Sequence, residues 1–410
     1  MNFPRRMFST VLLGGSLLMP GFVRGEETVK PVPPQPPAPP VAPLPPQTAT
    51  PAVAPIASQT PAPVPPVPSA NPLTAEQVAE LVKDLGSDDY KARSEAEKKL
   101  RTAGPEALPE LEKATSSNDP EIKSRASKIL GGLRAAPVLQ KMSDVYAQTP
   151  SMESDLEIKM FMRGMEATMA GHLKSLTDGK KFTMSLGMTL QGMQMFTKST
   201  GDGTYMWNEM SMAPQGGGPP VPRMVQKIPL AFIEKVGGSD GQTNPLQALK
   251  DLREKYNFNA YSEGKLGDLD CFIIEGTMKQ EALDKRVKAI EEVNGAEAAK
   301  TARVQFSQMS RTRLYVNKKD YLTYRNELLD EAGTVVLVMD IKNIQLGNTF
   351  EPSTFQYTPP PGVQVMDIEK LQKDAMQMQK VKQAMSEDDP DPKAPKTPTP
   401  PPSLKRPEGK

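Results

Sequence analysis

The side chains that most often perform catalysis are scarce in this sequence. Its 410 residues include one histidine, His172, and one cysteine, Cys271. A nucleophile needs a base within hydrogen-bonding reach, so this composition predicts neither a Cys-His pair nor a Ser-His-Asp triad. His172 lies beside Lys174 in a polar context typical of a surface histidine. Cys271 begins the apolar run Cys271-Phe-Ile-Ile274, which favours an inert buried thiol. We therefore expect no catalytic residues and no enzyme activity.

Methionine is the most distinctive residue type. Fourteen of the 24 methionines fall between Met142 and Met224. The side chain is unbranched and polarizable, so a surface rich in it adapts to apolar ligands of irregular shape, such as acyl chains. The repeated Met-x-Met pairs could also offer thioethers to Cu(I). On a strand, however, each pair lies on one face, where apolar packing already explains it. We expect no metal site and no cofactor.

Apolar residues that share one side of predicted strands are the candidates for lining a ligand cavity. The main candidates are Met160, Met162, Met184, Leu186 and Met188, and the further candidates are Phe182, Trp207 and Phe355. The alternative is that these side chains fill an ordinary core beneath helices.

Strict alternation of apolar and polar residues predicts the elements that carry these side chains. It is clearest over 156–162 and 182–190, and it indicates strands with one apolar and one polar face. Further strands are expected over 194–200, 204–212, 271–278, 311–317, 322–329, 334–343 and 353–357. Helices are expected over 245–256 and 280–302. Together these elements predict a large antiparallel sheet with helices on its apolar face.

A small all-α segment is expected before the sheet, over 73–136. Thr74 and Gln77 form a capping-box pattern that starts its first helix. Asp89–Arg93 and Glu121–Arg125 match residue by residue at a period of about 32, similar to HEAT-like helical hairpins. A final helix, 138–147, is expected beyond Pro137. The segment is either a structural cap or a surface that docks a protein partner.

The two ends of the chain have compositions unsuited to a folded core. Residues 1–25 match a secretory signal peptide, with Arg5-Arg6 before a short apolar run, and a twin-arginine signal is the alternative. Residues 26–72 are a proline-rich disordered spacer or a ligand for a partner domain. A helical extension is expected over 369–387 and a disordered tail over 388–410.

Several segments resemble the C-terminal half of the outer-membrane lipoprotein carrier family. The most specific is Phe355–Asp367, with a strand, a Pro-Pro-Gly turn and a Val-x-Val-x-Asp exit. The others are Arg313–Asp320, Leu322–Leu329, Gly333 and Val335–Ile341. Thr200–Trp207 similarly resembles the mid-domain hairpin of the family. The resemblance covers about 138–368. It implies an unclosed antiparallel β-barrel with helices in its concave face, around a cavity that takes acyl chains.

The expected function is binding in the cell envelope. The formal net charge of +1 leaves no electrostatic footprint for nucleic acid. Because no cysteine follows the signal, the mature chain is expected to be periplasmic or otherwise exported and not anchored by lipid. We expect a soluble carrier or sensor that holds a lipid, an acyl chain or a lipoprotein. The alternative is a scaffold that docks a protein partner through the HEAT-like helices and the spacer.

Overall fold

The computed structural model describes residues 73–162, 165–177, 179–190, 192–216, 221–235, 245–371, 373–374 and 377. The chain forms two compact units, residues 1–126 and 127–410, and each is described by itself. The expected signal peptide, the spacer, the tail and most of the extension over 369–387 lie outside the described residues.

The first unit is helical, as expected. Its elements are α1 (Ala75–Asp84), α2 (Tyr90–Ala103), the 3-10 helix η1 (Gly104–Ala107), α3 (Leu108–Ala114) and the first turns of α4 (Pro120–Gln148). The capping box at α1 is confirmed. The backbone N–H of Gln77 donates to Thr74 Oγ1, and the backbone N–H of Thr74 donates to Gln77 Oε1. Val78, Leu85, Ala96, Leu100 and Leu111 are buried and form the core of this unit.

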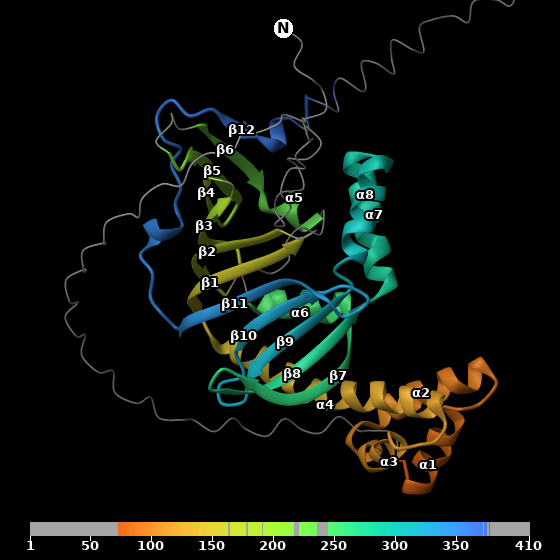
Figure 1. Ribbon diagram of the computed structural model, residues 1–410. Helices are drawn as coiled ribbons and strands as arrows, with labels where there is room; N and C mark the ends of the chain where they lie inside the picture. The colour runs from red at the N-terminus through yellow and green to blue at the C-terminus, as the bar shows by residue number, and fades with distance from the viewer. Residues whose placement is uncertain are drawn as a thin grey trace, which may run out of the picture. The chain divides into compact units, whose positions relative to one another are not determined.

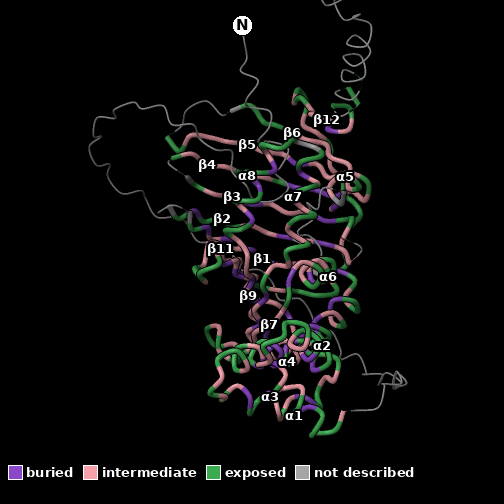
Figure 2. The backbone as a smooth tube through the Cα atoms, turned by 90° about the vertical axis from the view of Figure 1, so that its right-hand side faces the viewer, coloured by how far each residue is buried: buried purple, intermediate pink, exposed green. Residues whose placement is uncertain are grey.

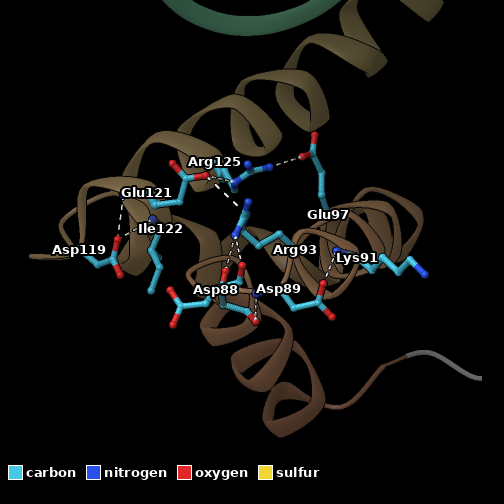
Figure 3. A network of polar contacts seen from close by, with 10 residues as sticks. Asp88, Asp89, Lys91, Arg93, Glu97, Asp119, Glu121, Ile122 and Arg125 are labelled. Atoms are coloured by element: carbon cyan, nitrogen blue, oxygen red, sulfur yellow. Dashed lines mark hydrogen bonds and ion pairs between the residues drawn. The ribbon is translucent and has the colours of Figure 1, made fainter.

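The starts of α2 and α4 repeat the same local structure (Figure 3). Asp89 Oδ1 accepts from the Lys91 amide, and Asp119 Oδ1 accepts from the Glu121 amide, both at 2.8 Å. Ser87 and Ser117 each accept the amide of the aspartate two residues later. The repeat of the caps is therefore 30 residues, because 119 minus 89 is 30. The sequence predicted a period of about 32 residues instead. That period aligns similar side chains on the two helices but not the caps that start them.

Helix α4 is one continuous helix through Pro137, so the expected break there is wrong. Proline removes one backbone donor and usually bends or ends a helix. Here Ala135, Val138, Leu139 and Met142 are buried in one apolar core of the second unit. Packing of this face holds the helix together across the proline.

The second unit is a twelve-stranded sheet that is not closed into a barrel (Figure 1). The strand order is β12-β6-β5-β4-β3-β2-β1-β11-β10-β9-β8-β7, and the pairs are antiparallel except the parallel pair β12 and β6. The strands are β1 (Ser151–Met162), β2 (Met165–Leu176), β3 (Lys181–Leu190), β4 (Met193–Asp202), β5 (Tyr205–Pro214), β6 (Val221–Pro229), β7 (Tyr256–Leu266), β8 (Leu269–Met278), β9 (Arg311–Asn317), β10 (Thr323–Leu329), β11 (Val335–Leu346) and β12 (Val365–Asp367). The α+β fold with an unclosed antiparallel sheet is confirmed.

Several elements differ from the expectation. The missed strands are β2, β6, β7 and β12, and the predicted strand over 353–357 contains part of the 3-10 helix η2 (Pro352–Phe355). The other helices are α5 (Leu230–Lys235), α6 (Pro245–Lys255), α7 (Gln280–Asn294) and α8 (Ala296–Ser307). The single helix expected over 280–302 is divided at Gly295, whose φ of 84° is unsuited to an α-helix.

One apolar core lies where α4 and α6 pack against β8 and β9. Tyr146, Leu249, Ile274, Leu314 and Val316 are among its buried residues. Burial decreases toward the other end of the sheet. Figure 2 shows buried residues near β1 and β9 and mostly intermediate ones along β4 and β5. The helices therefore cover one half of the sheet more fully than the other.

Candidate ligand-binding face

The cross-strand register gathers the methionines on one face of the sheet. Residues directly opposite each other on paired strands lie on the same face. Ile158, Met169, Met188, Met195 and Met212 form one such row across β1 to β5. All eleven methionines of β1–β6 whose side chains the structure describes lie on the face of this row: Met152, Met160, Met169, Met184, Met188, Met193, Met195, Met206, Met210, Met212 and Met224. We call it the methionine face, and the opposite side the outer face.

The accessibility of the methionine face increases from β1 to β6. Met160 is buried, with 4% of its surface exposed. Met184 and Met195 are half-buried, and Met224 is 40% exposed. The same row continues from Ile158 to Met339 in β11 and on to the core beneath α4 and α6. The methionine face thus continues across the sheet, with the polar Asn326 of β10 between Met339 and Leu314, and it has a covered half and a more accessible half.

Most of the predicted lining residues lie on this face. Met160, Phe182 and Leu186 are buried, and Met184 and Met188 are half-buried. Met162 lies opposite Met165 at the end of β1 and β2, where the side chains are outside the described part of the structure. The sheet brings five of the eight predicted residues onto one surface.

Trp207 is on the outer face, so its prediction as a lining residue beside Met184 is wrong. Its cross-strand partner is Thr200, which is opposite Thr183, and Thr183 alternates with Met184 along β3. Trp207 Nε1 donates to Asp202 Oδ2 at 2.9 Å, and its ring stacks on Tyr357 with a centroid separation of 5.5 Å. Its aromatic character suggested a lining residue, whereas the register of β5 with β4 places the ring on the opposite face.

Phe355 belongs to the segment that joins β11 to β12 (Figure 1). We call this segment the strap (residues 347–364). The Phe355 ring packs edge-on against Phe350, whose ring lies 5.5 Å from Lys174 Nζ. Lys174 is on the outer face, because its neighbour Leu173 pairs with Met184. Phe355 is buried where η2 contacts β3 and β4, and its partner Phe350 lies beside Lys174 of the outer face, so the prediction that Phe355 lines the methionine face is wrong.

The strap is fastened by polar contacts. The Tyr357 hydroxyl donates to Glu209 Oε2 at 2.9 Å, and burial together with this bond to a carboxylate raises the pKa of Tyr357. Lys227 Nζ lies 3.4 Å from Asp367 and 3.9 Å from the centre of the Tyr205 ring. Aromatic and charged groups of the outer face thus hold the chain that leads to β12.

Two buried hydroxyls on the methionine face have no hydrogen-bond partner among the described residues. Ser154 of β1 and Ser175 of β2 have 0% and 1% of their surface exposed. Ser154 pairs with Leu173 and Ser175 pairs with Phe182, so the two serines are diagonal neighbours. The sequence did not identify them, because the strand predicted over 156–162 begins after Ser154 and no strand is predicted where Ser175 lies. The alternation of Met169, Gly171, Leu173 and Ser175 was the available signal.

Ser175 lines a recess at this end of the face. Tyr146, Thr149, Ser151 and Met152 also line it, and its volume of about 10 Å³ has room for one group of the size of a water molecule. Thr149 donates to the Val145 carbonyl and Ser151 donates to the Asn348 carbonyl. The recess therefore combines hydroxyl groups with an apolar wall.

His172 is on the outer face and is partly exposed, in accord with a surface histidine. Nδ1 lies 2.8 Å from Asp155 Oδ1, and Nε2 lies 2.9 Å from Glu153 Oε1. Burial acts to raise the pKa of Glu153, but hydrogen bonds from Lys174, Asn348 and His172 outweigh it, and the pKa is lowered. Hydrogen bonds from Asn343 and His172 lower the pKa of Asp155. This arrangement ties β1, β2 and the end of β11 together.

Cys271 is fully buried, and burial raises the pKa of its thiol, which favours the unreactive protonated form. Within the described residues, no group of three or more His, Cys, Asp or Glu side chains is placed to hold a metal ion. None of the described helices has the length and apolarity to cross a membrane.

The site thus lies on a large open antiparallel sheet with helices on one face. Solved structures with this class of fold are similar to the chain. An uncharacterized conserved protein from Thermus thermophilus has a TM-score of 0.32 and 11% identity, over 57% of this chain and 99% of that one. A chain in the MucA/MucB complex of Pseudomonas aeruginosa has a TM-score of 0.30 and 12% identity, over 56% and 68%. A putative outer membrane lipoprotein-sorting protein domain from Vibrio parahaemolyticus has a TM-score of 0.24 and 13% identity, over 54% and 97%.

Comparison by sequence found no relatives of the chain. The sequence matches no protein-family model, and a search of curated proteins found no match.

Proposed function

We propose that this chain is an exported, non-enzymatic protein that binds an apolar ligand on the methionine face, as a carrier or a sensor in the cell envelope. The observation that carries the proposal is the segregation of all eleven described methionines of β1–β6 to one face. A sheet that only needed a core would be served by Leu, Ile and Val, which are more rigid. Flexible thioether side chains instead suit a surface that repacks around different chains.

The exposure of this face supports a binding role. Met184, Met188, Met195 and Met210 are half-buried and Met224 is more exposed, so the apolar surface is accessible where β3 to β6 lie. Covering partly exposed apolar surface stabilises a complex by about 25 cal/mol per Å². A lipid or an acyl chain offers such surface without needing directional partners. A lipoprotein would be bound through its acyl chains.

The proposed export rests on the basic and apolar N-terminal residues of the sequence. Fractionation of cells that produce the full chain tests it. We expect the processed protein in the envelope fraction, and a cytoplasmic, unprocessed protein would contradict this part of the proposal.

Native mass spectrometry of the purified full chain tests the binding proposal. We expect added mass that is lost on organic extraction, and acyl species in the extract. The extracted protein should then take up a fluorescent fatty acid. A protein that purifies empty and fails to bind the fluorescent acyl probe after extraction would overturn the proposal, and would leave the helical unit as the part that binds a partner.

A further inference from the structure

We infer that the recess beside Ser175 receives one hydroxyl or carbonyl oxygen of the uncharged polar head of the acyl ligand, and that the protein therefore selects neutral hydroxyl- or ester-bearing lipids over anionic ones. The inference rests on the proposed function, because it takes the methionine face as the site of the acyl chain. It adds the chemical class of the head and the residues that recognise it.

The two serines without partners point to a ligand group. A buried hydroxyl without a partner is costly, and such groups are rare in folded proteins. Ser154 and Ser175 are both fully buried, both lie on the methionine face, and they are diagonal neighbours on β1 and β2. Their hydroxyls can each donate one hydrogen bond and accept others. A polar group that entered the recess would satisfy the hydroxyl of Ser175, which lines it.

The recess is joined to the apolar surface that would hold the chain. Met152 lines the recess and lies opposite Ser175, which in turn lies opposite Phe182. Phe182 is followed on the same face by Met184, Leu186 and Met188 along β3. A ligand with its head at Ser175 would therefore lay its chain along β3 toward the accessible methionines.

The chemistry of the walls selects an uncharged head. No charged side chain is among the residues that line the recess in the described part of the chain. Lys174, which follows Leu173 in β2, is on the outer face and pairs with Glu153. A carboxylate or phosphate placed here would lose its hydration without gaining a cation, which is unfavourable. Hydroxyl and ester groups need only the donors and acceptors that the recess supplies.

Three probes with the same oleoyl chain test this selection in the full-length, lipid-extracted protein: monooleoylglycerol, oleate and oleoyl lysophosphatidylglycerol. We expect monooleoylglycerol to bind roughly ten-fold more tightly than either anionic probe, because only the anions lose hydration without compensation. Ser175→Ala should weaken the binding of monooleoylglycerol about five-fold, which corresponds to the loss of one hydrogen bond, and leave the binding of oleate unchanged. Thr200→Val is the matched control and should leave the binding of all three probes unchanged, because the Thr200 hydroxyl is also buried and without a partner among the described residues but lies on the outer face.

A second measurement separates recognition from a structural role. Removing a hydroxyl that has no partner should leave the melting temperature of the ligand-free protein unchanged or raise it, whereas loss of a structural or water-bridged hydroxyl would lower it. Equal binding of all three probes, or no effect of Ser175→Ala on the affinity for monooleoylglycerol, would overturn this inference and leave the proposed function intact. Failure of every probe to bind would instead overturn the proposed function.

Discussion

Met195 and Phe196 are adjacent in β4 but lie on opposite faces of the sheet. Met195 is opposite Met188 and Met212, and Phe196 is opposite Gly187 and Ser211. Phe196 is 48% exposed, and Met195 is half-buried. The two neighbours therefore allow the two faces of the same strand to be tested separately.

Met195→Asp should weaken binding of a fluorescent fatty acid at least ten-fold, because a carboxylate would be desolvated against the acyl chain. Phe196→Asp should change the affinity by less than about two-fold, since it adds the same charge on the other face. Fluorescence titration measures both, and circular dichroism confirms that both variants fold. Met195→Gln provides a milder substitution if the aspartate variant unfolds. Equal losses in the Met195 and Phe196 variants would refute the assignment of the binding face.

The close approach of β2 to β3 depends on Gly171. A Cβ atom added there would lie 1.7 Å from the Ser185 carbonyl oxygen, so the backbones of β2 and β3 would have to separate. We expect Gly171→Ala to lower the free energy of unfolding by about 3 kcal/mol or more, in the range of severe core substitutions. Gly187→Ala is the control, because its nearest neighbours would be 3.7 Å away, and we expect a change within about 1 kcal/mol. Urea titration followed by circular dichroism measures both.

The single tryptophan reports on the strap and not on the methionine face. Trp207 stacks on Tyr357 and lies on the outer face. We expect Tyr357→Leu to shift the tryptophan emission to longer wavelength, because water gains access to the indole. Saturation of the wild-type protein with monooleoylglycerol should leave the emission unchanged. A ligand-induced shift as large as that of Tyr357→Leu would place the ligand at the strap instead.

Acid should weaken the connection between β1 and its neighbours. The pKa values of Glu153 and Asp155 are lowered in the folded protein from about 4.5 and 3.8, so the unfolded chain binds more protons in this range. The stabilisation is present above these values and is lost as the pH falls through the folded pKa values. We expect the melting temperature to fall below pH 4.5, and to fall less steeply in Glu153→Gln with Asp155→Asn. Glu331→Gln, in an exposed turn, should retain the wild-type slope.

Arg93 stabilises the turn between α1 and α2. Its Nη1 donates to the carbonyls of Ser87 and Asp88 at 2.6 and 3.0 Å (Figure 3). Arg93→Met should lower the local stability of the helical unit by about 2 kcal/mol, because bonds to a charged donor are lost. Arg101→Met removes a surface pair with Glu97 and should cost less than about 0.5 kcal/mol. Hydrogen exchange of residues 90–125 in the full chain measures the difference, and equal exchange in both variants would contradict it.

Local pattern was sufficient to predict much of the fold. The period-two alternation over Phe182–Leu190 gave a correct strand, and the capping box at Thr74 gave a correct helix start. Both signals act between residues close in the chain, where backbone geometry fixes the spacing of side chains. The same alternation placed Met184, Leu186 and Met188 on one side of their strand, because side chains two residues apart in a strand point the same way.

Contacts between distant residues decided the rest. Pro137 does not break α4 because buried residues on both sides hold the helix to the sheet. Trp207 and Phe355 look like lining residues by type, but the register of β4 with β5 and the path of the strap place them on the outer face. Ser154 and Ser175 become diagonal neighbours only through the pairing of β1 with β2. The sequence alone determined that this chain is rich in methionine and poor in catalytic groups, whereas strand pairing decided that its methionines form one surface with a polar recess at its end.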